Sequence, residues 1–137
     1  MAALSADRET KRKDGEILEL PVAGSTKIYK GSLVALNTSG YAVPGADTAS
    51  FIFAGVAMEQ ADNSGSATNG AETVRVYRKG IFSFAASGMA ITNVGTAVFI
   101  VDDQTVGLAA TTTNDIACGK IADFESATEV WVDIDQR

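Results

Sequence analysis

Short apolar segments, separated by Gly, Asn, Asp, Ser and Thr, run through the chain from residue 29 to residue 134. In several of them every second side chain is apolar, which is the period of a half-buried β-strand. Val74 and Val76 are expected on one face of such a strand. Arg75 and Tyr77 are expected on the opposite face. The pattern therefore predicts strands, and no segment has the apolar period of a helix of two turns or more.

The segments recur about every 8–12 residues, a spacing typical of an all-β fold. We predict a compact small β-barrel or β-sandwich of about nine or ten short strands. Residues 33–43 are expected to form a hairpin. In the last strand, residues 129–134, we expect Val130, Val132 and Ile134 to point inward. The expected strands lie at residues 16–22, 33–36, 41–44, 51–58, 73–78, 81–85, 96–101, 106–108, 116–124 and 129–134.

Three stretches interrupt this pattern. Residues 61–71 consist of small and polar side chains, so we predict an exposed loop or a mobile tip that contributes nothing to a core. Residues 79–80, Lys-Gly, indicate a turn or bulge. Residues 87–94 are expected to hold a short helical turn.

The chain has 137 residues, of which 46% are hydrophobic, and this size and composition fit one folded domain. Residues 1–15 are polar and lack periodicity, so we predict an extended basic N-terminal arm. Residues 16–137 are predicted to form a single β domain. No apolar run is long enough for a transmembrane helix, and the start of the chain lacks the apolar core of a signal peptide.

Charge is unevenly distributed along the chain. Residues 8–13 carry four positive charges and one negative charge, whereas the chain from residue 15 onward has seven basic and fourteen acidic residues. Most nucleic-acid affinity comes from neutralising phosphates, which an acidic surface repels. We therefore expect no direct nucleic-acid binding by the body of the protein.

The sequence offers little for catalysis. It contains no histidine, and its one cysteine, Cys118, lies in an apolar run and is expected to be buried. Asp102 and Asp103 are adjacent, and they fit the cap of a hairpin turn better than a metal site. No phosphate-binding loop is present. We predict that the protein is not an enzyme and has no catalytic residues, cofactor or metal site.

Aromatic and basic side chains are the remaining candidates for binding. Tyr77 and Trp131 occupy the polar positions of their strands, and such residues are enriched in interfaces. They would face outward, or lie in a core if both faces of the sheet are covered. The candidate interface comprises four residues of the arm and five of the domain: Arg8, Lys11, Arg12, Lys13, Arg75, Tyr77, Arg78, Lys79 and Trp131.

Several segments, in order along residues 17–134, resemble the capsid cement, or head decoration, proteins of tailed bacteriophages. They are Pro-Val-Ala at residues 21–23, Ile-Tyr-Lys-Gly-Ser-Leu-Val-Ala-Leu-Asn at 28–37, Gly-Tyr-Ala-Val-Pro at 40–44, Phe-Ala-Gly-Val-Ala at 53–57, Ala-Asp-Asn-Ser at 61–64, Arg-Lys-Gly-Ile-Phe-Ser-Phe at 78–84, Val-Asp-Asp-Gln-Thr-Val at 101–106 and Val-Trp-Val-Asp-Ile at 130–134. The order and spacing of these segments carry the resemblance, since each alone is ordinary β-protein sequence.

The resemblance implies a β-rich protein, made in the host cytoplasm, that binds in many copies to the outer capsid surface of the virion. Its partners would be the major capsid protein and itself, as a homotrimer, with no membrane involved. We expect Arg8, Lys11, Arg12 and Lys13 to contact a neighbouring capsid subunit. Two alternatives remain: a carbohydrate- or ligand-binding β-module on the virion surface, favoured if Tyr77 and Trp131 share one concave face, and a minor head or tail structural protein.

Overall fold

The computed structural model describes residues 3–9, 11 and 15–135, with the side chain of Asp135 left out. Regular structure in this part of the chain is nearly all β, as the sequence predicts. Two short 3-10 helices are the exception: η1 (Ile91–Asn93) and η2 (Ala109–Thr111). The twelve strands are β1 (Ile17–Pro21), β2 (Thr26–Ile28), β3 (Leu33–Leu36), β4 (Ala42–Pro44), β5 (Ile52–Ala57), β6 (Ala61–Asn63), β7 (Thr73–Tyr77), β8 (Lys79–Ala85), β9 (Ala97–Ile100), β10 (Val106–Gly107), β11 (Ala117–Ser126) and β12 (Glu129–Asp135).

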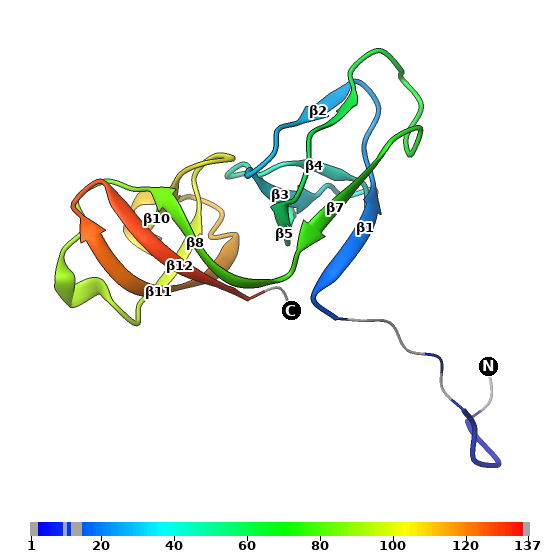
Figure 1. Cartoon of the computed structure of the whole chain (residues 1–137), viewed down its shortest axis with the longest axis horizontal. Coiled ribbons are helices and arrows are strands. Elements are labelled where there is room, and N and C mark those ends of the chain that lie inside the picture. Colours follow the sequence, from blue (N-terminus) through cyan, green and yellow to red (C-terminus); the bar gives the residue numbers. More distant parts are fainter. Residues whose placement is uncertain (1–2, 10, 12–14, 136–137) are drawn as a thin grey trace.

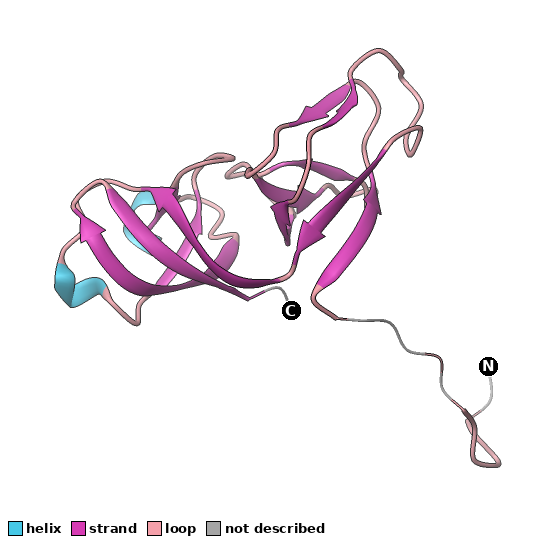
Figure 2. Cartoon of the chain, viewed as in Figure 1, coloured by secondary structure: helices cyan, strands magenta, loops and turns pink. Residues whose placement is uncertain are grey.

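The strands form two five-stranded sheets and one two-stranded sheet (Figures 1 and 2). The first sheet has the order β1-β7-β5-β3-β4, and the second has the order β10-β9-β11-β12-β8. All pairs within these sheets are antiparallel. The small sheet pairs β2 with β6. The second sheet curls into a half-barrel, and its two outermost strands come together only near one end, where Ala85 bridges to Thr105.

Each large sheet has its own apolar core. The first core contains Val34, Val74 and Val76 of the first sheet together with Ile28 and Ala61 of the small sheet. The second core lies within the curl of the second sheet and also receives side chains from the first sheet. These are Leu33, Phe53 and Val56, all at most 4% exposed. The two sheets therefore share apolar contacts that hold them against each other.

The chain passes directly from the first sheet to the second through Arg78, between β7 and β8 (Figure 1). The Arg78 backbone N–H donates to the Glu16 carbonyl at 2.8 Å, which holds the crossing against the start of β1. Gly80 follows with a φ of 130°, a backbone conformation that favours glycine. The predicted turn or bulge at residues 79–80 is therefore a bend at the start of β8.

Most of the predicted strands are present. Residues 33–36 and 42–44 pair as a hairpin, and η1 supplies the short helical turn expected within residues 87–94. Val74 and Val76 are fully buried, whereas Arg75 and Tyr77 are exposed. In the last strand the three side chains expected to point inward are all buried. The structure has twelve strands rather than nine or ten because β2 and β6 are short strands with no apolar period.

The prediction for residues 61–71 is wrong at the start of this stretch. Ala61 and Asn63 are buried, and their strand β6 pairs with β2. The Asn63 side-chain amide donates to the carbonyls of Val22, Ala23 and Thr68 at 3.0–3.3 Å. A polar side chain thus becomes part of the interior by satisfying backbone acceptors, which a count of apolar residues does not detect.

One carboxylate ties the β4–β5 connection to the loop before β11. Asp47 accepts the backbone N–H groups of Thr113 and Asn114, each at 2.8 Å. The Asn114 side-chain amide donates in return to the Asp47 carbonyl at 3.0 Å. These bonds to backbone N–H groups favour the charged carboxylate and lower the pKa of Asp47. This clamp connects a loop of the first sheet to a loop of the second.

We predict that replacing Asp47 with Ala lowers the free energy of unfolding at pH 7. Because the folded state lowers the pKa of Asp47, its contribution is complete above the ordinary carboxyl pKa of about 4. The contribution is lost as the pH falls through the lowered value. Urea unfolding of wild type and Asp47→Ala should therefore differ at pH 7 and converge towards pH 2. Glu72→Ala is the control, because Glu72 is exposed and its carboxylate takes no part in the clamp; equal losses for both variants at pH 7 would contradict the clamp.

Candidate interaction surfaces

The predicted basic residues of the domain do not form one patch. Arg75 is exposed, but it forms an ion pair with Glu59, with 2.6 Å between Nη2 and Oε1. The same carboxylate raises the pKa of Arg75. Arg78 is half-buried at the crossing between the sheets, and its Nη1 lies 3.4 Å from the Gly15 carbonyl. Lys79 is exposed and lines a groove between the sheets.

The two candidate aromatic residues lie on different sheets. Tyr77 is 36% exposed, and its ring packs against that of Phe82 with 5.6 Å between centroids. Trp131 is half-buried, and its Nε1 donates to Glu125 Oε2 at 3.2 Å. Trp131 pairs with Ser83, which follows Tyr77 by six residues, or roughly 20 Å of extended chain. The two rings thus belong to neighbouring parts of the two sheets.

The described residues of the N-terminal arm, 3–9, 11 and 15, are all exposed and lie outside the sheets (Figure 1). Among them are Arg8 and Lys11, which are accessible to a partner. Arg12 and Lys13 lie outside the described residues.

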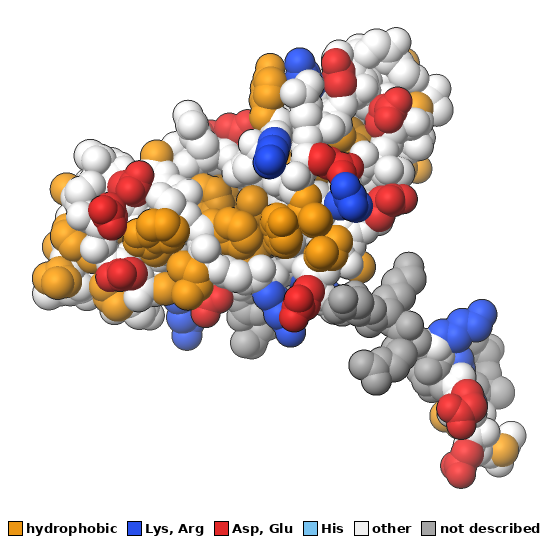
Figure 3. Space-filling view, in the orientation of Figure 1, with side chains coloured by type: hydrophobic (Ala, Val, Ile, Leu, Met, Phe, Trp, Pro, Cys, Tyr) orange, Lys and Arg blue, Asp and Glu red, His pale blue; other side chains and the backbone are white. Residues whose placement is uncertain are grey.

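An apolar surface lies where β7 leads into β8. Figure 3 shows apolar side chains gathered in a band across this part of the molecule. Ile17 pairs with Tyr77 and is 40% exposed, and Phe82 contacts the Tyr77 ring. We call Ile17, Tyr77 and Phe82 the junction patch; Phe82 is half-buried and also packs against the second core. Ile81, next along β8, is 57% exposed. Exposed apolar residues grouped in this way are typical of contact sites.

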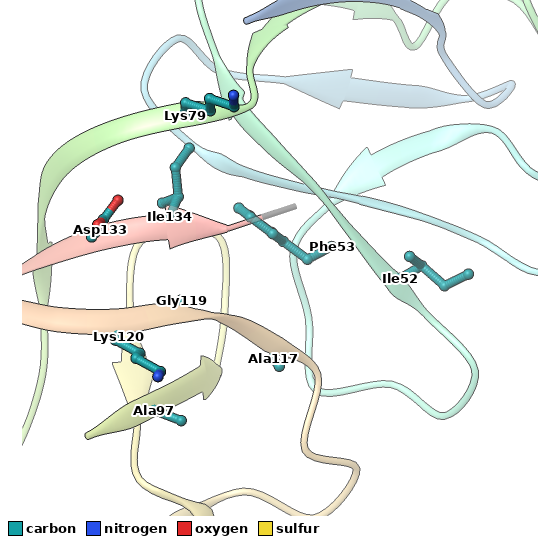
Figure 4. Close-up of a pocket in the computed structure, with 9 residues that line it drawn as sticks. All are labelled: Ile52, Phe53, Lys79, Ala97, Ala117, Gly119, Lys120, Asp133 and Ile134. Carbon is teal, nitrogen blue, oxygen red and sulfur yellow. The ribbon is translucent and has the colours of Figure 1, made fainter. Parts of the chain in front are cut away.

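A groove of about 620 Å³ lies between the two sheets (Figure 4). One wall is β5, with Ile52 and Phe53. The opposite wall is built from the second sheet, including the start of β8. The residues that line this wall are Lys79, Ala97, Ala117, Gly119, Lys120, Asp133 and Ile134.

Neither the groove nor the junction patch as a whole is predicted from the sequence, although Tyr77 of the patch is a predicted interface residue. Ile81 could have been found, because Phe82 and Phe84 occupy the inward positions of β8 and leave Ile81 on the outward face. Lys120 and Ile52 could not, because they meet only through the packing of two sheets that are distant in sequence. Of the predicted interface residues, only Lys79 contributes to the groove.

The remaining candidate chemistry is structural. Asp102 Oδ1 accepts the Gln104 backbone N–H at 2.9 Å within the turn between β9 and β10, as predicted. Within the described part of the chain, no group of three or more Cys, Asp or Glu side chains is placed to hold a metal ion. No described helix is long and apolar enough to cross a membrane.

Cys118 is fully buried, and burial raises the pKa of its thiol to about 12.

We predict that Cys118 resists thiol reagents in the folded protein. The thiolate is the reactive form, and a thiol with a pKa of about 12 forms almost none at pH 8. A maleimide or disulfide reagent should therefore label the protein at pH 8 only after urea unfolds it. Rapid labelling of the native protein would show that Cys118 is accessible and would contradict its place in the core.

Comparison with known proteins finds no match for this chain. This holds for models of protein families, for curated proteins and for solved structures. The features of the chain that bear on its function are therefore the arm, the junction patch and the groove, together with the resemblance of the segments along residues 17–134.

Proposed function

We propose that this protein is a structural capsid cement protein, which binds the outer surface of an assembled phage capsid and bridges neighbouring major capsid protein subunits. The observation that carries the proposal is the junction patch, in which Ile17 and Tyr77 are 40% and 36% exposed, together with Ile81 beside it in the chain, which is 57% exposed. A surface of this kind indicates a protein partner. The resemblance of the segments along the strands supports a capsid as the site of assembly.

The stabilising mechanism is a linkage between binding and assembly. A protein that binds only the assembled lattice shifts the equilibrium towards that lattice, with an effect that grows with its free concentration. Several weak contacts on one rigid body act together, because the first contact raises the effective concentration of the others. The shared core between the two sheets gives the rigid body that this mechanism needs.

The arm and the domain have different tasks in this proposal. The arm carries the positive charges of Arg8, Lys11, Arg12 and Lys13 on an otherwise acidic protein, and it contacts acidic residues of a neighbouring capsid subunit. The junction patch contacts a second copy of the protein and supports a homotrimer, since contacts between identical subunits are typically more apolar than other interfaces.

We predict that the protein binds purified capsids that lack it and does not bind unassembled capsid subunits. Changing Arg8, Lys11, Arg12 and Lys13 to Gln should weaken capsid binding about tenfold, since four exposed charges each contribute a few tenths of a kcal/mol. The salt dependence of binding should become weaker as well. Cosedimentation with capsids at several salt concentrations measures both effects.

Deleting residues 2–14 should weaken binding at least as much as the four substitutions. Equal affinity of the deletion variant and the wild type would contradict the role of the arm. Equal binding to capsids and to unassembled subunits would contradict the cement mechanism itself.

We predict that Tyr77→Glu prevents self-association without unfolding the domain, because it places a charge in the centre of the junction patch. Tyr29→Glu is the matched control, since Tyr29 is 57% exposed and lies outside the patch with Lys27 5.0 Å from its ring centroid. Light scattering should give a trimer for the wild type and the control, and a monomer for Tyr77→Glu. A monomeric wild type at high concentration, or a trimeric Tyr77→Glu, would contradict this assignment.

A further inference from the structure

The groove between the sheets is hollow because small residues line it. Ala97, Ala117 and Gly119 face the space between β5 and the second sheet. Gly119 has a φ of 154°, and a Cβ at this position would collide with the Asp133 carbonyl. The volume of the groove, about 620 Å³, lies within the range of roughly 300–1,000 Å³ that is typical of pockets with a bound ligand. There is therefore room for side chains of a partner.

The inner part of the groove is apolar. Phe53 and Ile134 belong to the shared core, and Figure 4 shows them entering the groove from β5 and β12. Ile52 lies beside Phe53 on β5 and is 54% exposed. A partner that covers these side chains would remove apolar surface from water, which favours binding.

The charged residues of the groove give it selectivity. Lys79 and Lys120 both line it, and neither forms an ion pair with a described side chain. Asp133 pairs with Lys120 in the strand register, and it is the one acidic lining residue among those described. The groove thus concentrates two of the seven positive charges of the chain from residue 15 onward, against fourteen negative charges. An acidic partner complements this arrangement.

We propose that the groove binds an extended acidic segment of the major capsid protein, with carboxylates at Lys79 and Lys120 and an apolar side chain against Phe53. This inference rests on the proposed cement function and names the contact that the domain makes. An extended segment fits because the groove runs between strands from two sheets. Asp133 repels a carboxylate and so restricts where the segment places its charges.

The capsid fits this site better than a second copy of the protein does. The arm and the groove are both basic, so one acidic partner complements both of them. The apolar junction patch already provides the contact between copies in the proposed trimer. One partner surface meeting the arm and the groove together also gives the avidity that bridging requires.

The first test changes the charges of the groove in the full-length protein. The double variant Lys79→Glu, Lys120→Glu should bind capsids lacking the protein with an affinity at least about tenfold lower, because two attractive contacts become repulsive. The double variant Lys27→Glu, Lys30→Glu is the control, since it changes the net charge by the same amount and neither lysine lines the groove. The capsid affinity of the control should fall much less. If the control and the groove variant lose affinity equally, the loss reflects net charge alone, and the inference is overturned.

The second test fills the groove without changing its charge. Ala117→Phe should weaken capsid binding, whereas Ala122→Phe, on the same strand at an exposed position outside the groove, should not. Thermal unfolding of both variants should match the wild type, since both side chains are exposed. Unchanged capsid binding by Ala117→Phe would overturn the inference.

The third test identifies the partner segment. A carbodiimide joins an amine to a carboxylate in contact with it, so treated complexes should contain Lys79 or Lys120 linked to an Asp or Glu of the major capsid protein. Peptide mass spectrometry detects the link. Links from these lysines only to a second copy of the protein would overturn the inference while the cement function stands. A wild-type protein that fails to bind capsids at all would overturn both.

Discussion

The packing of Leu33, Phe53 and Val56 from the first sheet into the core of the second sheet determines the shape of this protein. The second sheet is a half-barrel whose outer strands meet only near Ala85 and Thr105, so its apolar interior needs a cover. The first sheet provides that cover with side chains that are at most 4% exposed. Burying apolar surface in this way is the main favourable term in folding.

The two surfaces with binding potential lie at the margins of this contact. The junction patch lies where β7 continues into β8, and the groove lies between β5 and the strands of the second sheet. Both surfaces are therefore fixed by the same apolar contact that holds the sheets together. A partner meets a preorganised surface, which lowers the entropic cost of binding.

In the assembly that we propose, charge gives these surfaces different partners. The junction patch is apolar and suits contact with an identical copy, whose acidic body would otherwise be repelled. The arm and the groove carry positive charges that the proposed capsid partner would complement with acidic residues. Arg75 takes no part in this division, because its charge is already paired with Glu59.

The sequence predicted what local periodicity determines, and it missed what depends on contacts between distant segments. The alternation of Val74 and Val76 with polar neighbours correctly identified β7 and its buried face. Asn63 was placed in an exposed loop because nothing in the local sequence reveals that three carbonyls surround its amide. Of the groove residues only Lys79 was a candidate, since Lys120 and Ile52 come from strands brought together by the shared core.

The proposed function and the proposed contact of the groove can both be tested with a cryo-electron microscopy map of the intact virion. We expect many symmetry-related copies on the outer capsid surface, with the groove facing the shell and occupied by a strand-like segment of the major capsid protein. Copies confined to one vertex or to the tail would contradict the cement function. Copies on the shell whose groove faces solvent would leave the cement function intact and contradict the capsid contact assigned to the groove.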